Sequence, residues 1–260
     1  MHRLNYILCF LAIALCSSPS SADTLCQRNC TFVLKSEDNG EYTIVNAERA
    51  QQRMTPWSTF KIPNSLIALD LGIIENTEVV LTFDRERYPV ENWWPEIWYK
   101  KPISLQTAFK YSALPIYQTT AKKIGQDQMN QYLKAFAYGN QDISSGIDNF
   151  WLNKSIKISA KEQVDFLQRM YQRELPVSDN ALAQLKRIML VTSTSDYKLY
   201  AKTGAGGIGN GQYLGWYVGF VENKDGVYYF ALNIDGPSFK EVGKMRIDAV
   251  MQQLQLAKVI

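Results

Sequence analysis

The sequence predicts an α+β fold of the α/β sandwich type, in which both ends of the chain form an antiparallel β-sheet with flanking helices. A helical subdomain is inserted between these ends. Two observations predict this arrangement. Segments rich in β-branched and aromatic residues occur at both ends of the 260-residue chain. Between them, from roughly residue 60 to 190, apolar residues recur at three- and four-residue spacing, as in helices. Strands grouped apart from helices are typical of α+β proteins.

Each element follows from a local pattern. The first two strands, 31–34 and 42–45, are joined through Asn39-Gly40, a dipeptide that favours a tight hairpin. Helical periodicity then covers 62–71, 105–124, 127–136, 160–172 and 180–190. Further strands are predicted at 197–203, 213–222 and 226–235, with a turn at 223–226, and an amphipathic helix at 242–256 closes the chain.

The first 22 residues have the pattern of a cleavable export signal. Arg3 supplies a positive charge, residues 7–15 form an apolar run too short to span a bilayer, and Ser20-Ser21-Ala22 offers small residues to a signal peptidase. Lipid attachment at Cys16 is disfavoured because the residue before it is bulky. The sequence therefore predicts an exported, periplasmic product, residues 23–260, that folds as a single domain.

Charge and hydropathy argue against several classes of partner. The formal net charge falls from +3 to +2 when Arg3 is removed, and no basic run occurs, so nucleic acid is not an expected partner. No later segment is apolar for long enough to cross a bilayer, so stable membrane association is not expected. Nothing in the sequence indicates the oligomeric state.

Cysteine and histidine usage narrow the chemistry. Of the four cysteines, only Cys26 and Cys30 follow the signal, and they form either a small disulfide loop or free thiols. Two thiolates alone are a poor metal site. The one histidine, His2, lies in the signal. The mature chain therefore lacks a Ser-His-Asp triad and a histidine-ligated metal, and any nucleophile needs a lysine or a carboxylate as its base.

One such pairing is Ser58-Thr59-Phe60-Lys61. About one Ser-x-x-Lys is expected by chance in a chain of this length, and Ser195-Asp196-Tyr197-Lys198 is a second copy that we interpret as a turn. Context strengthens the first copy, because an apolar helix follows it and helical spacing places Lys61 on the same face as Ser58. Burial would lower the pKa of Lys61 and leave a neutral amine, able to act as a base or to add carbon dioxide.

A second chemical element is Lys202-Thr203-Gly204, at the end of a predicted strand. It would place a cation and a hydroxyl where an anionic carboxylate can dock, with the peptide N–H groups of Ser58 and Ala205 forming an oxyanion hole. There are two candidates for a proton-relaying serine. We interpret Ser178-Asp179-Asn180 as an ordinary helix N-cap, and favour Ser112-Ala113-Leu114, which lies at a proline kink.

Taken in order, these elements resemble those of the class D β-lactamases, or oxacillinases. Five motifs match: Ser58-Thr59-Phe60-Lys61, Ser112-Ala113-Leu114, Tyr138-Gly139-Asn140, Trp151-Leu152 and Lys202-Thr203-Gly204. Flanking sequence such as Gly215-Trp216-Tyr217-Val218-Gly219 matches as well, and the resemblance covers essentially the whole mature chain. It implies the penicillin-binding, serine β-lactamase fold.

The resemblance also implies roles for the matching residues. Ser58 would be acylated by a β-lactam, and Lys61, as its N-carboxylated derivative, would be the general base for both half-reactions. Ser112 would relay protons, and Trp151 would donate its indole N–H to the carbamate. The residues that would hold the substrate are Lys202, Thr203, Gly204, Ala205, Leu114 and Arg246. No metal and no dissociable organic cofactor is implied, only carbon dioxide or bicarbonate to carboxylate Lys61.

Two departures from the family pattern leave the range of β-lactam substrates open. Leu114 replaces the usual valine and is one methylene larger, and Ala205 stands where many relatives carry an aromatic ring. Trp93, Trp94 and Trp98 are interpreted as a packed or partly exposed lip of the cleft, with stacking against substrate side chains as the alternative.

Two rival functions share such a site. A β-lactam sensor domain would be acylated without turnover, but it needs membrane helices to signal. A penicillin-binding transpeptidase or carboxypeptidase of the same superfamily is disfavoured by the small size of the chain and by the match at Trp151. The sequence therefore predicts an exported serine β-lactamase that hydrolyses small-molecule β-lactam antibiotics.

Overall fold

The computed structural model describes residue 26 and residues 29–152 and 155–260. The predicted signal, residues 1–22, lies outside the described residues. No helix within the described ranges has both the length and the hydropathy that crossing a bilayer requires.

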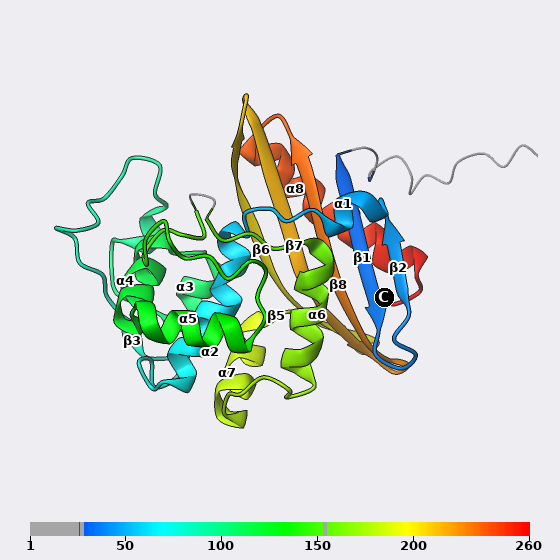
Figure 1. Ribbon diagram of the computed structural model, residues 1–260, viewed down its shortest axis with the longest axis horizontal. Coiled ribbons are helices and arrows are strands. Elements are labelled where there is room, and N and C mark those ends of the chain that lie inside the picture. Colours follow the sequence, from blue (N-terminus) through cyan, green and yellow to red (C-terminus); the bar gives the residue numbers. More distant parts are fainter. Residues whose placement is uncertain (1–25, 27–28, 153–154) are drawn as a thin grey trace, which may run out of the picture.

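The predicted antiparallel sheet is confirmed, and both ends of the chain build it (Figure 1). Its strands are β1 (Cys30–Ser36), β2 (Tyr42–Val45), β5 (Leu190–Ser193), β6 (Tyr197–Gly209), β7 (Gln212–Asn223) and β8 (Gly226–Gly236). Their order is β2-β1-β8-β7-β6-β5. The first strand therefore pairs with the last, with Phe32 opposite Leu232.

The helices mostly follow the predicted periodicity. They are α1 (Ala47–Gln51), α2 (Lys61–Asp70), α3 (Leu105–Lys110), α4 (Leu114–Ile124), α5 (Gln126–Ala135), α6 (Ala160–Tyr171), α7 (Asp179–Met189) and α8 (Phe239–Leu256). The helix predicted at 105–124 is divided into α3 and α4, because Ser112 between them has a left-handed backbone with φ 56°. The inserted part also contains a two-stranded ribbon of β3 (Val80–Leu81) and β4 (Ile103–Ser104).

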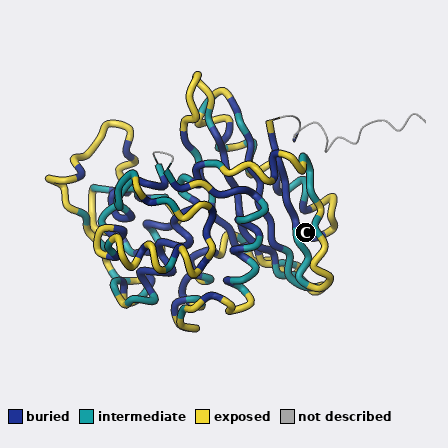
Figure 2. Tube along the Cα trace, viewed as in Figure 1, coloured by how far each residue is buried: buried dark blue, intermediate teal, exposed yellow. Residues whose placement is uncertain are grey.

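Helices cover both faces of the sheet, so a hydrophobic core forms on each side and the strands between them are largely buried (Figure 2). Successive side chains of a strand point to opposite faces, so Phe32 and Leu34 pack toward Val250 of α8 while Val33 belongs to the core of the inserted helices. The larger core continues through α2, whose residues from Lys61 to Leu69 are all buried. This central helix carries the residues of the candidate site.

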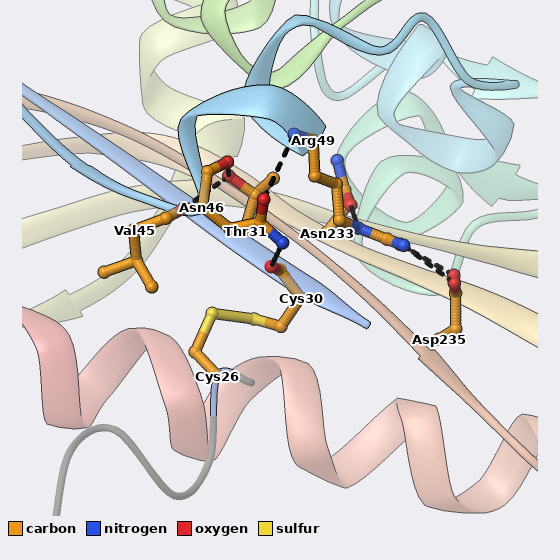
Figure 3. Close-up of a disulfide and its surroundings, with 8 residues drawn as sticks. All are labelled: Cys26, Cys30, Thr31, Val45, Asn46, Arg49, Asn233 and Asp235. Atoms are coloured by element: carbon orange, nitrogen blue, oxygen red, sulfur yellow. Dashed lines mark hydrogen bonds and ion pairs between the residues drawn. A yellow bond between two sulfur atoms is a disulfide. The ribbon is translucent and has the colours of Figure 1, made fainter. Parts of the chain in front are cut away.

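The N-terminal part of the sheet is held by a disulfide and by a buried ion pair (Figure 3). Cys26 and Cys30 are joined, which resolves the alternative that the sequence left open. On the other side of β1, Arg49 donates two hydrogen bonds of 2.8 Å to the carboxylate of Asp235 and one of 2.6 Å to Asn233. These contacts attach α1 to β8.

Replacing Arg49 by methionine is expected to lower the free energy of unfolding by about 3 kcal/mol, because it leaves the carboxylate of Asp235 and the buried amide of Asn233 without their partner. Urea unfolding of the whole protein measures this difference. Arg53→Met is the matched control, since the ion pair of Arg53 with Glu162 is more exposed and contributes less than about 1 kcal/mol. Equal losses in the two variants would contradict the assigned role of Arg49.

Candidate active site

Ser58 and Lys61 lie where two kinds of helix meet. The 3₁₀-helix η1 (Trp57–Phe60) continues directly into α2, so the side chain of Lys61 lies beside that of Ser58, as the three-residue spacing predicts. Lys61 Nζ donates a hydrogen bond of 3.0 Å to Ser58 Oγ. Ser58 is partly exposed, whereas Lys61 is only 1% exposed. A reachable hydroxyl thus contacts an amine that is shielded from water.

Burial changes the chemistry of that amine. Desolvation lowers the pKa of Lys61 from 10.5 to about 7, so a large fraction of the side chain is neutral at physiological pH. The Nζ atom lies 4.9 Å from the centre of the Tyr117 ring, which offers an electron-rich face but no carboxylate. A neutral amine in contact with a serine hydroxyl can accept its proton.

Strand β6 approaches η1 so closely that two of its positions require glycine. A Cβ atom on Gly204 would lie 2.8 Å from the carbonyl oxygen of Pro56, and one on Gly206 would lie 2.3 Å from the indole of Trp57. Neither distance is compatible with van der Waals contact. The glycine of Lys202-Thr203-Gly204 therefore lets this motif lie against the helical turn that carries Ser58.

Ser112 contacts the same motif. Lys202 Nζ donates a hydrogen bond of 2.6 Å to Ser112 Oγ and one of 3.1 Å to the carbonyl of Thr203. On α8, Arg246 Nη1 donates a bond of 2.6 Å to the carbonyl of Gly204. The structure therefore brings together residues that are far apart in the sequence and come from η1, α2, the α3–α4 junction, β6 and α8.

Three basic side chains gather here without a compensating acid. None of Lys61, Lys202 and Arg246 forms an ion pair within the described ranges. Burial, with repulsion from the other two cations, holds the pKa of Lys202 well below its usual range, and burial lowers the pKa of Arg246 to about 10. Unbalanced positive charge of this kind favours binding of an anion.

The chain is similar to known proteins in sequence and in fold. The chain matches the penicillin binding protein transpeptidase domain over residues 30–254. The crystal structure of FUS-1 (OXA-85), a class D β-lactamase from Fusobacterium nucleatum subsp. polymorphum, is 34% identical with a TM-score of 0.82, over 89% of this chain and 93% of that one. The chain belongs to the class D β-lactamases.

Curated relatives of this class D β-lactamase agree with that membership. β-Lactamase OXA-48 of Klebsiella pneumoniae is 40% identical over 228 residues, which cover 88% of this chain and 83% of the relative. β-Lactamase OXA-19 of Pseudomonas aeruginosa is 37% identical over 209 residues, 80% of this chain and 76% of the relative. The predicted enzyme class, a hydrolase with the penicillin-binding fold, is therefore confirmed.

In this class D β-lactamase, Trp151 is buried and packs against Phe60, the residue that precedes Lys61. Its ring stacks on Phe60, with ring centres 5.5 Å apart and planes 15° apart. Tyr138-Gly139-Asn140 closes the base of the surrounding loop, because Asn140 N–H donates to the Lys157 carbonyl at 2.9 Å and Asn140 Oδ1 accepts from Lys157 N–H at 2.8 Å. Residues 153–154 of that loop lie outside the described residues.

The structure also shows where the other candidate motifs of the class D β-lactamase lie. Ser178 accepts a hydrogen bond from Ala181 N–H and caps α7, as predicted. Ser195 and Lys198 of the second Ser-x-x-Lys are exposed, Ser195 in the turn before β6. Leu114 and Ala205 are partly buried and lie next to the Ser112 and Gly204 segments.

Two residues that support the site of the class D β-lactamase, Gln163 and Trp57, were not predicted from the sequence. Gln163 on α6 donates a bond of 2.9 Å to Thr59 Oγ1, and Thr59 Oγ1 donates one of 2.8 Å to the Pro56 carbonyl, so η1 is tied to α6. The signal for Gln163 was available, since it is a polar residue within the apolar stripe of the 160–172 helix. The left-handed backbone of Trp57, with φ 51°, left no signal in the sequence pattern.

Proposed function

We propose that this enzyme hydrolyses the β-lactam amide bond through an acyl-enzyme on Ser58, with N-carboxylated Lys61 as the general base. The observation that carries this proposal is a partly exposed serine hydroxyl bonded to the buried amine of Lys61, with two further basic groups, the buried Lys202 and the partly buried Arg246, at the same site. Such a site offers a nucleophile, a base and a docking point for the carboxylate that penicillins carry. Small-molecule β-lactam antibiotics are therefore the proposed substrates.

In acylation, Ser58 Oγ attacks the lactam carbonyl while its proton passes to the carbamate on Lys61, the side chain whose Nζ lies 3.0 Å from Ser58 Oγ before carboxylation. The N–H groups of Ser58 and Ala205 stabilise the oxyanion that forms. Ser112 relays this proton from the carbamate on Lys61 to the leaving nitrogen, which restores the base, and Lys202, Thr203 and Arg246 hold the substrate carboxylate. Water, activated by the same base, then cleaves the ester and restores Ser58.

Two properties of Lys61 support its carboxylation. Its lowered pKa supplies the neutral amine that reacts with carbon dioxide. A carbamate would also place a negative charge near Lys202 and Arg246, so that these two basic groups gain a counter-charge. The carbamate provides one anionic base for both half-reactions in a mature chain that contains no histidine. Carbon dioxide or bicarbonate is thus the only added component that the proposal needs.

Steady-state hydrolysis of benzylpenicillin, with and without added bicarbonate, tests the proposed function. We expect sustained turnover that rises severalfold with bicarbonate after the protein has been degassed at acidic pH. Stoichiometric acylation without turnover in both conditions would instead indicate a β-lactam sensor, and turnover of a D-Ala-D-Ala peptide would indicate a carboxypeptidase. Turnover that does not change with bicarbonate would contradict the proposed carboxylation of Lys61 but not the proposed hydrolysis.

We also propose that the mature enzyme, residues 23–260, acts as one catalytic domain in the periplasm. The Cys26–Cys30 disulfide supports this location, because disulfides persist in oxidising compartments and are rare in the cytosol. The disulfide joins the segment after the predicted signal to the first strand of the sheet, so the chain becomes crosslinked at the point where the fold begins.

A further inference from the structure

The loop between β3 and β4 projects from the helical part of the molecule (Figure 1). Much of its surface is exposed (Figure 2), yet it buries two tryptophans, Trp94 at 5% and Trp98 at 8% exposure. Trp93 remains 59% exposed and packs edge-to-face against both of them. Exposed loops seldom bury two indoles, so the contacts of these rings call for an explanation.

The indole of Trp98 contacts the backbone next to the candidate site. Its Nε1–H donates a hydrogen bond of 2.9 Å to the carbonyl oxygen of Tyr111. That carbonyl belongs to the peptide unit that joins Tyr111 to Ser112. The side chain of Trp98 therefore holds the peptide plane immediately before Ser112.

Ser112 needs such support because its own backbone is strained. A serine at φ 56° occupies a region that costs on the order of 1 kcal/mol or more and persists only when its surroundings enforce it. In this conformation Ser112 Oγ lies 2.6 Å from Lys202 Nζ. Rotation of the preceding peptide toward a relaxed φ would move the hydroxyl away from Lys202.

We propose that Trp98 is a positioning residue that holds Ser112 in its proton-relaying geometry through the Tyr111 carbonyl. This inference rests on the proposed role of Ser112 in acylation. It connects the projecting loop to the reaction, because movement of the tryptophan cluster changes the orientation of the relaying hydroxyl. The three neighbouring indoles differ in their partners, which makes the proposal testable.

Trp94 is the matched control for Trp98. Both rings are buried in the same cluster, with centres 5.9 Å apart, but the indole nitrogen of Trp94 is buried and has no hydrogen-bond partner among the described residues. Replacement by phenylalanine therefore removes a similar ring volume at both positions and a hydrogen bond only at Trp98. The exposed indole of Trp93 donates its hydrogen bond to the side chain of Glu91.

The test is single-turnover acylation by a chromogenic β-lactam, analysed as a rate constant and a dissociation constant. Trp98→Phe is expected to lower the acylation rate constant about tenfold, the loss of one hydrogen bond, and to leave the dissociation constant within about twofold. Trp94→Phe is expected to leave both constants within about twofold. Equal effects of the two substitutions would overturn the proposal.

A double-mutant cycle separates this proposal from the proposed function. If Trp98 acts through Ser112, Trp98→Phe has no further effect on acylation in a Ser112→Ala background. An undiminished tenfold loss in that background would overturn the positioning role. A Ser112→Ala enzyme that acylates at the normal rate would instead refute the relay itself.

Indole hydrogen exchange in the unsubstituted protein covers the case in which Trp98→Phe fails to fold. A bonded indole exchanges more slowly than an unbonded one of equal burial, so Trp98 is expected to exchange more slowly than Trp94 although it is slightly more exposed. Faster exchange at Trp98 would show that the bond to Tyr111 does not persist in solution and would overturn the proposal.

Discussion

Replacing Ser58 by alanine is expected to abolish covalent labelling by penicillin and to lower turnover by about 10⁶-fold, the scale at which a serine hydrolase loses activity without its nucleophile. The reason is geometric. Ser58 Oγ is the hydroxyl in contact with Lys61 Nζ, and Ser112 is bonded to Lys202 instead. Intact-protein mass spectrometry after mixing with benzylpenicillin measures the adduct directly.

The second Ser-x-x-Lys supplies the control for this experiment. Ser195 has the same local sequence pattern but is exposed, and its hydroxyl bonds to Asp196. Ser195→Ala is therefore expected to keep full activity and a full penicillin adduct. An adduct of unchanged stoichiometry in Ser58→Ala would refute the assignment of the nucleophile.

Replacing Lys61 by alanine is expected to slow deacylation by about 10³-fold or more, so that the acyl-enzyme on Ser58 accumulates. Acylation also slows, because no other base contacts the Ser58 hydroxyl among the described residues. Stopped-flow measurement of the two phases resolves both steps. The control is Lys198→Ala, at the exposed copy of the motif, for which both rates are expected to stay unchanged. Normal turnover in Lys61→Ala would contradict the assignment of the base.

The pH dependence of the unsubstituted enzyme follows from the same lysine. Since burial lowers the pKa of Lys61 to about 7, the ammonium form predominates below that pH and can neither accept the proton of Ser58 nor react with carbon dioxide. We expect kcat/KM to fall about tenfold per pH unit below about pH 7. A rate that stays level from pH 7 to 5 would contradict this.

Stability should change with pH in the same sense. Between about pH 7 and 10.5 the unfolded chain binds a proton at Lys61 that the folded chain lacks, so the free energy of unfolding rises with pH across that window. Below pH 7 both states are protonated and the full cost of burying the charge remains. In Lys61→Ala the rise is expected to be smaller, which urea unfolding at pH 7 and pH 9 would show.

Most of the fold could be predicted because burial leaves a repeating pattern in the sequence. The strands near Phe32 and Leu232 and the stripe of α6 follow from alternation and from helical spacing. Periodicity does not predict the division between α3 and α4, for which the proline kink after Ser112 was the one sequence signal. Apolar spacing continues through Ser112, and periodicity records which side chains are buried rather than the sign of φ.

The sequence likewise predicts the local contacts of the candidate site but not the long-range ones. The contact between Ser58 and Lys61 is local and follows from three residues of helix. The bond between Ser112 and Lys202 joins positions 90 residues apart, so no local spacing predicts it, although both residues were selected as candidates from their motifs. The hydrogen bond from Trp98 to Tyr111 could not be predicted from the sequence. Its acceptor is a backbone carbonyl, which every residue type has.

Because the first strand pairs with the last, the sheet of this enzyme cannot be completed until most of the chain has been synthesised. β1 has no partner on its inner edge until β8 has been made, and α8, which covers the second core and carries Arg246, follows later still. Such long-range closure is slow and needs the complete chain. A ribosome that stops before α8 therefore leaves a fragment with an open core and an incomplete group of cations rather than a weakened antibiotic-degrading enzyme.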